Sequence, residues 1–306
     1  MAELFQPTDE EIQHNIKKWN IPMPQKDYMV VVQCSTYNQE AYIEDALKGF
    51  VMQKTNFPFC ALVTDDCSTD GTAAIIKKYA VEYPDIIIPI LLGENHMQHK
   101  KTRYPYIGPW HKRAKYIAIC EGDDYWTDPL KLQKQVDFME SNSNCVLSQH
   151  AALKLYPDGS VQESRRCTET VLCCTPENVI LEEGAGITCS TMFKTELDTI
   201  QPDWRTITSA GDLVLILIAL NEGDVGYIDE VMGCYRVSAK GSWTQRIAEN
   251  YHKNLQHYGK IIQMYLEYNA WSNRKFEPVI KRKIREIKIR RFKYILLHYK
   301  NMLCGE

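Results

Sequence analysis

Apolar runs that alternate with amphipathic segments constrain the fold of this chain more than any other feature. Four short runs are apolar almost throughout, at 28–34, 59–65, 85–92 and 115–121. Between the first three runs, apolar residues recur at helical spacing, at 40–53 and 70–83. Strands buried on both faces that alternate with helices are typical of an α/β fold with a mostly parallel sheet. Ligands of such sheets bind beyond the carboxyl ends of the strands.

Three polar stretches follow these strands and are expected to meet at one edge of the sheet. They are "STYN" at 35–38, "DDCSTDGT" at 65–72 and "EGDDYW" at 121–126. In the second stretch, Thr69 and Asp70 are expected to cap the next helix. Asp65 and Asp66 instead extend the strand to the edge, where a carboxylate can accept hydrogen bonds from a base or a sugar.

The third stretch places Glu121, Asp123 and Asp124 within four positions. Carboxylates this close repel one another, so a positive group normally sits among them. A solvated acidic turn is the alternative interpretation. At the carboxyl end of a strand, however, such a cluster suits a hard divalent cation that shares its ligands with a diphosphate.

Composition excludes several classes of protein. The 306 residues are 44% hydrophobic and 25% charged with a net charge of −3, so no overall field favours nucleic acid. Eleven cysteines show no zinc-type spacing, and with a polar start they predict reduced thiols in the cytoplasm. The longest apolar run, 213–220, is too short to span a bilayer. Neither GxGxxG nor the phosphate-binding GxxxxGK[ST] motif is present.

The rest of the chain continues this pattern. The segment 128–140 predicts a helix with Asp128 at its N-cap, and 211–223 predicts a buried helix. The segment 226–237 predicts a final pair of strands, and the chain is helical and basic from about 243.

Three of these segments in this order carry a resemblance: "VVVQCSTYNQEAYIEDAL", "VTDDCSTDGT" and "YIAICEGDDYWTDPLKLQKQVDFME". The chain resembles the family-two glycosyltransferases of bacterial surface-polysaccharide type. The resemblance implies a GT-A nucleotide-diphospho-sugar transferase fold, Rossmann-like with a mixed, mostly parallel sheet. It also implies a nucleotide-diphosphate sugar donor, UDP being favoured, with Mn²⁺ or Mg²⁺, and inversion at the transferred sugar.

The same resemblance assigns roles to residues at the edge of the sheet. Nucleotide binding is expected from Ser35, Thr36, Tyr37, Asp65, Asp66, Glu121 and Asp123. Asp123 and Asp124 match the metal site. The family usually has aspartate where this chain has Glu121, and a longer side chain there is expected to reach the ribose. In the basic segment 93–116, Lys101 or Arg103 is the candidate contact to base or phosphates, and a flexible basic loop is the alternative.

An inverting transfer needs a general base beside the acceptor hydroxyl. The resemblance assigns this role to Asp212, and capping of the helix at 211–223 is the competing role. Thr188, Ser190, Arg236 and Trp243 are candidate acceptor contacts, although a place in the core explains the first two nearly as well. The processive QxxRW signature is absent.

The basic tail at 277–303 is expected to form an amphipathic helix. It predicts peripheral contact with the inner face of a membrane, or packing on the catalytic domain or a dimer partner. Nucleic acid is the least favoured partner.

The predicted organisation is a leader at 1–27, a GT-A domain at 28–240 and a helical C-terminal extension at 241–306. Within the GT-A domain, 28–126 is expected to bind the nucleotide and 127–240 the acceptor. The predicted function is sugar transfer to a glycan or lipid-linked acceptor. The alternative is a catalytically silent partner that binds a sugar nucleotide or glycan during polysaccharide assembly.

Overall fold

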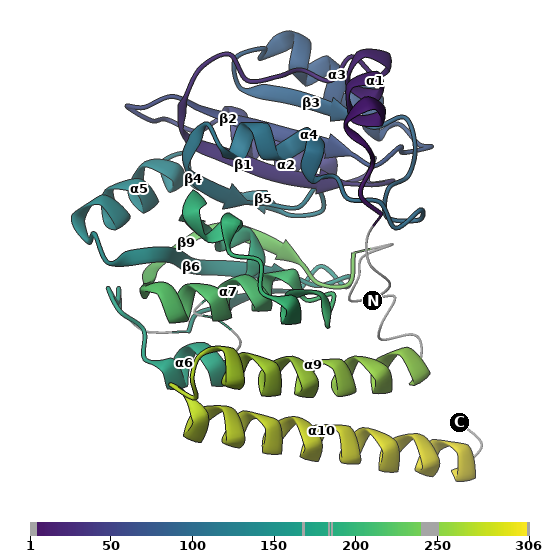
Figure 1. Cartoon of the computed structure of the whole chain (residues 1–306), viewed down its shortest axis with the longest axis vertical. Coiled ribbons are helices and arrows are strands. Elements are labelled where there is room, and N and C mark those ends of the chain that lie inside the picture. Colours follow the sequence, from purple (N-terminus) through teal and green to yellow (C-terminus); the bar gives the residue numbers. More distant parts are fainter. Residues whose placement is uncertain (1–4, 167–168, 183, 185, 240–250, 305–306) are drawn as a thin grey trace.

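The computed structural model describes residues 5–166, 169–182, 184, 186–239 and 251–304, and it shows helices on both sides of one mixed sheet (Figure 1). The strands are β1 Tyr28–Thr36, β2 Phe59–Asp65, β3 Ile87–Leu91, β4 Ala114–Ile119, β5 Tyr125–Trp126, β6 Cys145–Leu155, β7 Val161–Ser164, β8 Met192–Lys194 and β9 Asp224–Arg236. The helices are α1 Asp9–Lys18, α2 Ile43–Val51, α3 Thr72–Glu82, α4 Tyr104–His111, α5 Lys131–Ser141, α6 Pro176–Leu181, α7 Gly211–Glu222, α9 Tyr251–Trp271 and α10 Glu277–Cys304.

The order of strands in the sheet is β3-β2-β1-β4-β8-β6-β9-β5, with β7 beside β6. The first four strands are parallel, as the apolar runs predicted, and β8 enters antiparallel between β4 and β6. The predicted nucleotide and acceptor halves therefore share one continuous sheet. β5, from the first half, pairs with β9, from the second.

Two hydrophobic clusters hold the layers together. One packs α2, α3 and α5 on the parallel strands, with Val30 and Val32 fully buried. The other packs α7, α9 and α10 around Leu217, Tyr227 and Tyr265. α9 and α10 lie side by side below α7 in Figure 1, and α6 lies at the left end of α9. No helix in the described ranges is long and apolar enough to cross a membrane.

Three expectations from the sequence differ from the structure. The strand pair expected at 226–237 is one long strand, because β9 pairs with β6 on both sides of the register shifts at His150 and Ala151 instead of turning back. The helix expected from Asp128 begins at Lys131, since Asp128 accepts a hydrogen bond from the Leu130 amide in a preceding turn. The leader contains a helix, α1, which a capping box of Thr8 and Glu11 initiates.

Candidate active site

The three polar stretches meet at the carboxyl edge of the parallel strands. The Asp66 amide donates to the Thr36 carbonyl at 3.0 Å, and the Gly122 amide donates to the Ser35 carbonyl at 3.0 Å. Gly122 allows this approach, because a Cβ atom there would lie 2.8 Å from the Thr36 Cβ and 2.5 Å from Gln39 Oε1. Parallel topology thus brings together the side chains that the sequence placed on one rim.

The acidic turn Glu121–Asp124 forms the centre of this rim. The Asp124 amide donates to the Glu121 carbonyl at 3.1 Å, which closes the turn. Asp123 and Asp124 are buried, whereas the Glu121 side chain keeps contact with solvent. Loss of solvent raises the pKa of the Asp123 carboxyl, and burial and the charge of Asp123 raise that of Asp124 well above its usual range.

The pKa of Glu121 is raised to about 7 by loss of solvent and then by the charges of Asp123 and Asp212, while Arg103 opposes the shift. Asp123 belongs to the acidic turn and Asp212 to the start of α7, so charges from both elements act on Glu121. The cluster costs folding free energy when it is ionised and no cation is bound.

We expect Glu121→Gln to stabilise the metal-free protein at alkaline pH. A carboxyl group whose pKa is higher in the folded state stabilises the fold when protonated, and this contribution is lost as pH rises from about 4.5 through about 7. Since solvent reaches the side chain, the gain at pH 8 is about 1 kcal/mol after allowance for screening. Urea denaturation at pH 4 and pH 8 measures it. A wild-type and a variant curve with the same pH dependence would contradict the assignment.

Arg236 at the end of β9 is the cation within this cluster. Its amide donates to Asp124 Oδ1 at 2.9 Å, and its guanidinium donates to the Asp123 carbonyl at 2.8 Å and pairs with Asp45 of α2. The guanidinium also lies 4.6 Å from the centre of the Tyr125 ring. Arg236, predicted as an acceptor contact, is therefore engaged mainly by the acidic turn.

The carboxylates fit a hard cation that has part of its coordination supplied by a substrate. Within the described residues, no group of three or more His, Cys, Asp or Glu side chains could hold a metal alone. Asp124 Oδ2 is buried and has no hydrogen-bond partner, and Asp123 lies beside it with a raised pKa. Magnesium-type sites commonly use one or two carboxylates together with phosphate oxygens.

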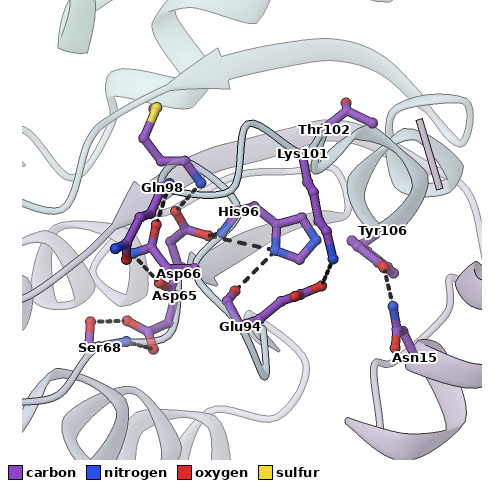
Figure 2. A network of polar contacts seen from close by, with 12 residues as sticks. Asn15, Asp65, Asp66, Ser68, Glu94, His96, Gln98, Lys101, Thr102 and Tyr106 are labelled. Atoms are coloured by element: carbon purple, nitrogen blue, oxygen red, sulfur yellow. Dashed lines mark hydrogen bonds and ion pairs between the residues drawn. The ribbon is translucent and has the colours of Figure 1, made fainter. Parts of the chain in front are cut away.

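Asp66 and Asp65 lie at the end of β2, and both carboxylates are satisfied by nearby loops (Figure 2). Asp66 Oδ1 accepts from the His96 amide at 2.8 Å, and Oδ2 accepts from the Met97 amide at 3.0 Å. Asp65 accepts from the amide and the hydroxyl of Ser68. Asp66 thus fixes the loop that follows β3, in addition to the base contact predicted for it.

The segment 93–116 is held in place by these contacts with Asp66, and part of it forms the helix α4. The interpretation of this segment as a flexible loop did not include a helix. The buried His96 ring packs edge-on to Trp19 and Tyr106, and Lys101 pairs with Glu94 (Figure 2). Arg103 precedes α4 and acts electrostatically on Glu121. The structure therefore places Arg103 near the acidic turn.

Asp212 lies in the first turn of α7. Its Oδ2 accepts from the Thr188 hydroxyl at 2.8 Å, and its Oδ1 accepts from the Leu213 amide at 2.8 Å. Ala210 occupies the N-cap position, so Asp212 does not fill the capping role that competed with catalysis. Asp212 is exposed and acts electrostatically on Glu121, which puts it near the acidic turn.

The remaining predicted residues differ in accessibility. Tyr37 is 44% exposed at the rim, Ser35 is partly buried, and Thr36 is buried with an unpaired hydroxyl. Ser190 is fully buried and donates to the Ile187 carbonyl at 2.6 Å, so the core explanation holds for it rather than the acceptor contact. Trp243 lies outside the described residues.

Sequence reasoning missed several residues that surround the acidic turn. Asp45 and Gln39, which hydrogen-bonds to Asp123, gave no signal because they lie in or beside an ordinary amphipathic helix. Lys131 was also missed. It is fully buried, its Nζ has no hydrogen-bond partner in the described structure, and it lies 3.8 Å from the centre of the Trp126 ring. The repulsion among the carboxylates was the one available clue to Arg236.

Comparison with known proteins agrees with the resemblance. The model of the family described as glycosyl transferase family 2 matches residues 32–193. An uncharacterised protein of Mycobacterium tuberculosis is 43% identical over 125 residues, which is 41% of this chain and 35% of that protein. The putative teichuronic acid biosynthesis glycosyltransferase TuaG of Bacillus subtilis is 27% identical over 68% of this chain and 79% of its own.

Solved structures show the same fold. Residues 1–349 of TarS from S. aureus, in complex with UDP, superpose with a TM-score of 0.54 at 20% identity, over 81% of this chain and 72% of that one. The mannosyltransferase PcManGT from Pyrobaculum calidifontis, with GDP-Man and Mn²⁺, gives 0.51 at 18% identity, over 97% and 88%. The predicted GT-A fold with C-terminal helices is confirmed. With more than half of its length matched by the family model, the chain belongs to glycosyl transferase family 2.

Proposed function

We propose that this protein transfers a sugar, with inversion, from a nucleotide-diphosphate sugar to a glycan or lipid-linked acceptor. The observation that carries the proposal is the meeting of the Glu121–Asp124 turn, Asp66 and Asp212 at one edge of the sheet. A cluster of carboxylates with raised pKa values is poised to gain a cation. TuaG, and a dTDP-rhamnosyl transferase of Shigella flexneri that is 30% identical over 41% of this chain, support a role in bacterial surface polysaccharide synthesis.

Asp212 acts as the general base in this proposal. One of its carboxylate oxygens takes the proton of the acceptor hydroxyl, while the acceptor oxygen bonds to the anomeric carbon and the bond to the diphosphate breaks. Thr188 holds the carboxylate through its 2.8 Å hydrogen bond.

The nucleotide lies along the rim from Asp66 to the acidic turn. Ser35, Thr36, Tyr37 and the Asp65–Asp66 pair frame the base, and Glu121 faces the ribose. Arg103 lies near enough to Glu121 to act on the phosphates as well. Mn²⁺ or Mg²⁺, when bound, would neutralise the diphosphate, and Asp123 and Asp124 would hold it. UDP is the favoured nucleotide, as in the TarS complex.

The working division of the chain follows from this assignment. Residues 28–126 supply the nucleotide contacts, 127–240 supply the base and acceptor contacts, and 241–306 form the helical extension. Cytoplasmic action agrees with the described cysteines, nine of which are free thiols.

A silent binding partner is the second candidate function. Glu121 in place of the usual aspartate favours it, because a longer acid changes the distance from the carboxylate to the nucleotide. The two functions differ in turnover and share metal-dependent binding of the nucleotide.

Calorimetric titration of UDP and GDP, with Mn²⁺ and then with a chelator, tests the nucleotide site. We expect binding that weakens at least tenfold on chelation and on Asp123→Ala, because both remove the charge balance of the diphosphate. Asp85→Ala, at an exposed acid far from the rim, is the matched control and should bind as the wild type does. Lack of binding by either nucleotide would overturn the proposal. Binding without turnover on any acceptor would favour the silent partner.

A further inference from the structure

The outer face of α10 carries an unusual combination of exposed apolar and basic side chains. Ile289, Phe292 and Leu296 are 49%, 61% and 53% exposed. Spacings of three and four residues put them on one side of the helix. Scattered exposed apolar residues are ordinary, but three in one row form a patch.

The opposite side of α10 already has its partners. Ile280, Ile284 and Ile287 are buried against the core, and Lys283 donates to the Leu181 carbonyl at 2.8 Å. Ile289 follows Ile287 by two residues, about 200° around the helix. The row of Ile289, Phe292 and Leu296 therefore faces away from the core, and Phe292 also borders a groove that Gly259 and Ile262 of α9 line. Figure 1 shows α10 as an outermost helix that runs beside α9 and passes under α6 at one end.

Tyr294 and His298, also in this half of α10, both stack on Tyr251 of α9. These stacks hold the C-terminal half of α10 against its neighbour. The outward row is consequently presented on a supported helix.

The middle and C-terminal part of α10 is strongly basic, unlike the chain as a whole. Between Lys281 and His298 there are eight lysines and arginines and one glutamate, although the whole chain has a net charge of −3. Arg285, Lys288, Arg290, Arg291 and Lys293 are exposed and form no ion pair with any described residue. The single acid, Glu286, pairs with Arg282.

We propose that this face of α10 docks on an anionic lipid bilayer. The row of Ile289, Phe292 and Leu296 would enter the interface between headgroups and acyl chains, and the flanking cations would meet lipid phosphates. A second copy of the chain fits less well, because two such faces would bring like charges together. Nucleic acid would leave the apolar row unused.

Vesicle flotation with the full chain and no substrate tests this inference independently of the proposed function. The probes are vesicles of phosphatidylglycerol and phosphatidylethanolamine, and vesicles of phosphatidylcholine alone. We expect binding to the first and not to the second, with about fivefold weaker binding for each cation removed in Arg285→Gln/Lys293→Gln. Phe292→Ser/Leu296→Ser should also reduce binding at least tenfold.

Matched controls lie elsewhere on the surface. Lys77→Gln/Lys78→Gln on α3 and Leu266→Ser on α9 change exposed residues of the same types and should bind as the wild type does. Absence of wild-type binding, or equal loss in the controls, would overturn the inference. So would a dimer, seen by sedimentation, that dissociates in Phe292→Ser/Leu296→Ser while vesicles remain unbound.

Discussion

Asp212→Asn is expected to lower the rate of sugar transfer by about 10²- to 10⁴-fold while nucleotide binding stays within about twofold of the wild type. The amide is isosteric and still accepts from the Thr188 hydroxyl, but it cannot take the proton of the acceptor. The effect should appear in kcat at saturating donor. Initial rates with donor and acceptor, together with titration of the nucleotide, measure the two quantities.

Two variants separate catalysis from a structural role of Asp212. Glu222→Gln, at the other end of α7, should transfer sugar at the wild-type rate. Thr188→Val, which removes the hydrogen bond to Asp212, should lower the rate by about tenfold because it frees the carboxylate to rotate. Wild-type turnover in Asp212→Asn would assign the side chain to the stability of the α7 N-terminus alone.

Lys131→Met is expected to raise the free energy of unfolding by about 3 kcal/mol at pH 7. Burial lowers the pKa of the Lys131 ammonium to about 7. A lysine whose pKa is lower in the folded state favours unfolding as pH falls from about 10.5 to about 7, because the unfolded chain takes up the proton first. Methionine fills the same space without a charge and keeps contact with Trp126.

The pH dependence distinguishes this account from a simple packing effect. The gain should be greatest near pH 7 and small near pH 10, as measured by urea denaturation at each pH. Lys134→Met on the same helix is the control. Lys134 is 32% exposed and pairs with Asp128 and Glu230, so its loss should be neutral or slightly destabilising. Equal stability of wild type and Lys131→Met at both pH values would show that the buried ammonium is compensated in solution.

Patterns within a short stretch of sequence predicted much of this molecule. The runs at 28–34 and 59–65 are apolar almost throughout, so they could be identified as buried parallel strands. Parallel topology then required their carboxyl ends to share an edge. The run at 115–121 adds a third strand end, so Ser35, Asp66 and Asp123 were predicted to lie on one rim. The sequence also predicted that α7 begins beside Asp212, because the apolar residues that follow form a continuous local pattern.

What the sequence did not predict depends on contacts between distant segments. Arg236 meets Asp45 across 191 residues and Asp124 across 112, and nothing near any of the three indicates the pairing. The continuity of β9 as a single strand comes from its pairing with β6. Lys131 sits in a helix with ordinary amphipathic spacing, so only the packing of α5 shows that its side chain is enclosed.

The position of Arg236 at the end of the last strand also bears on the order in which the molecule assembles. Contacts between residues far apart in the chain require closure of long loops, so they form late in folding. The carboxylates of the acidic turn emerge from the ribosome long before their cation does, and until β9 docks they depend on water and protons for compensation. We therefore expect the rim to be completed only when β9 docks on β5 and β6, because Arg236 reaches Asp45 and the acidic turn from that strand.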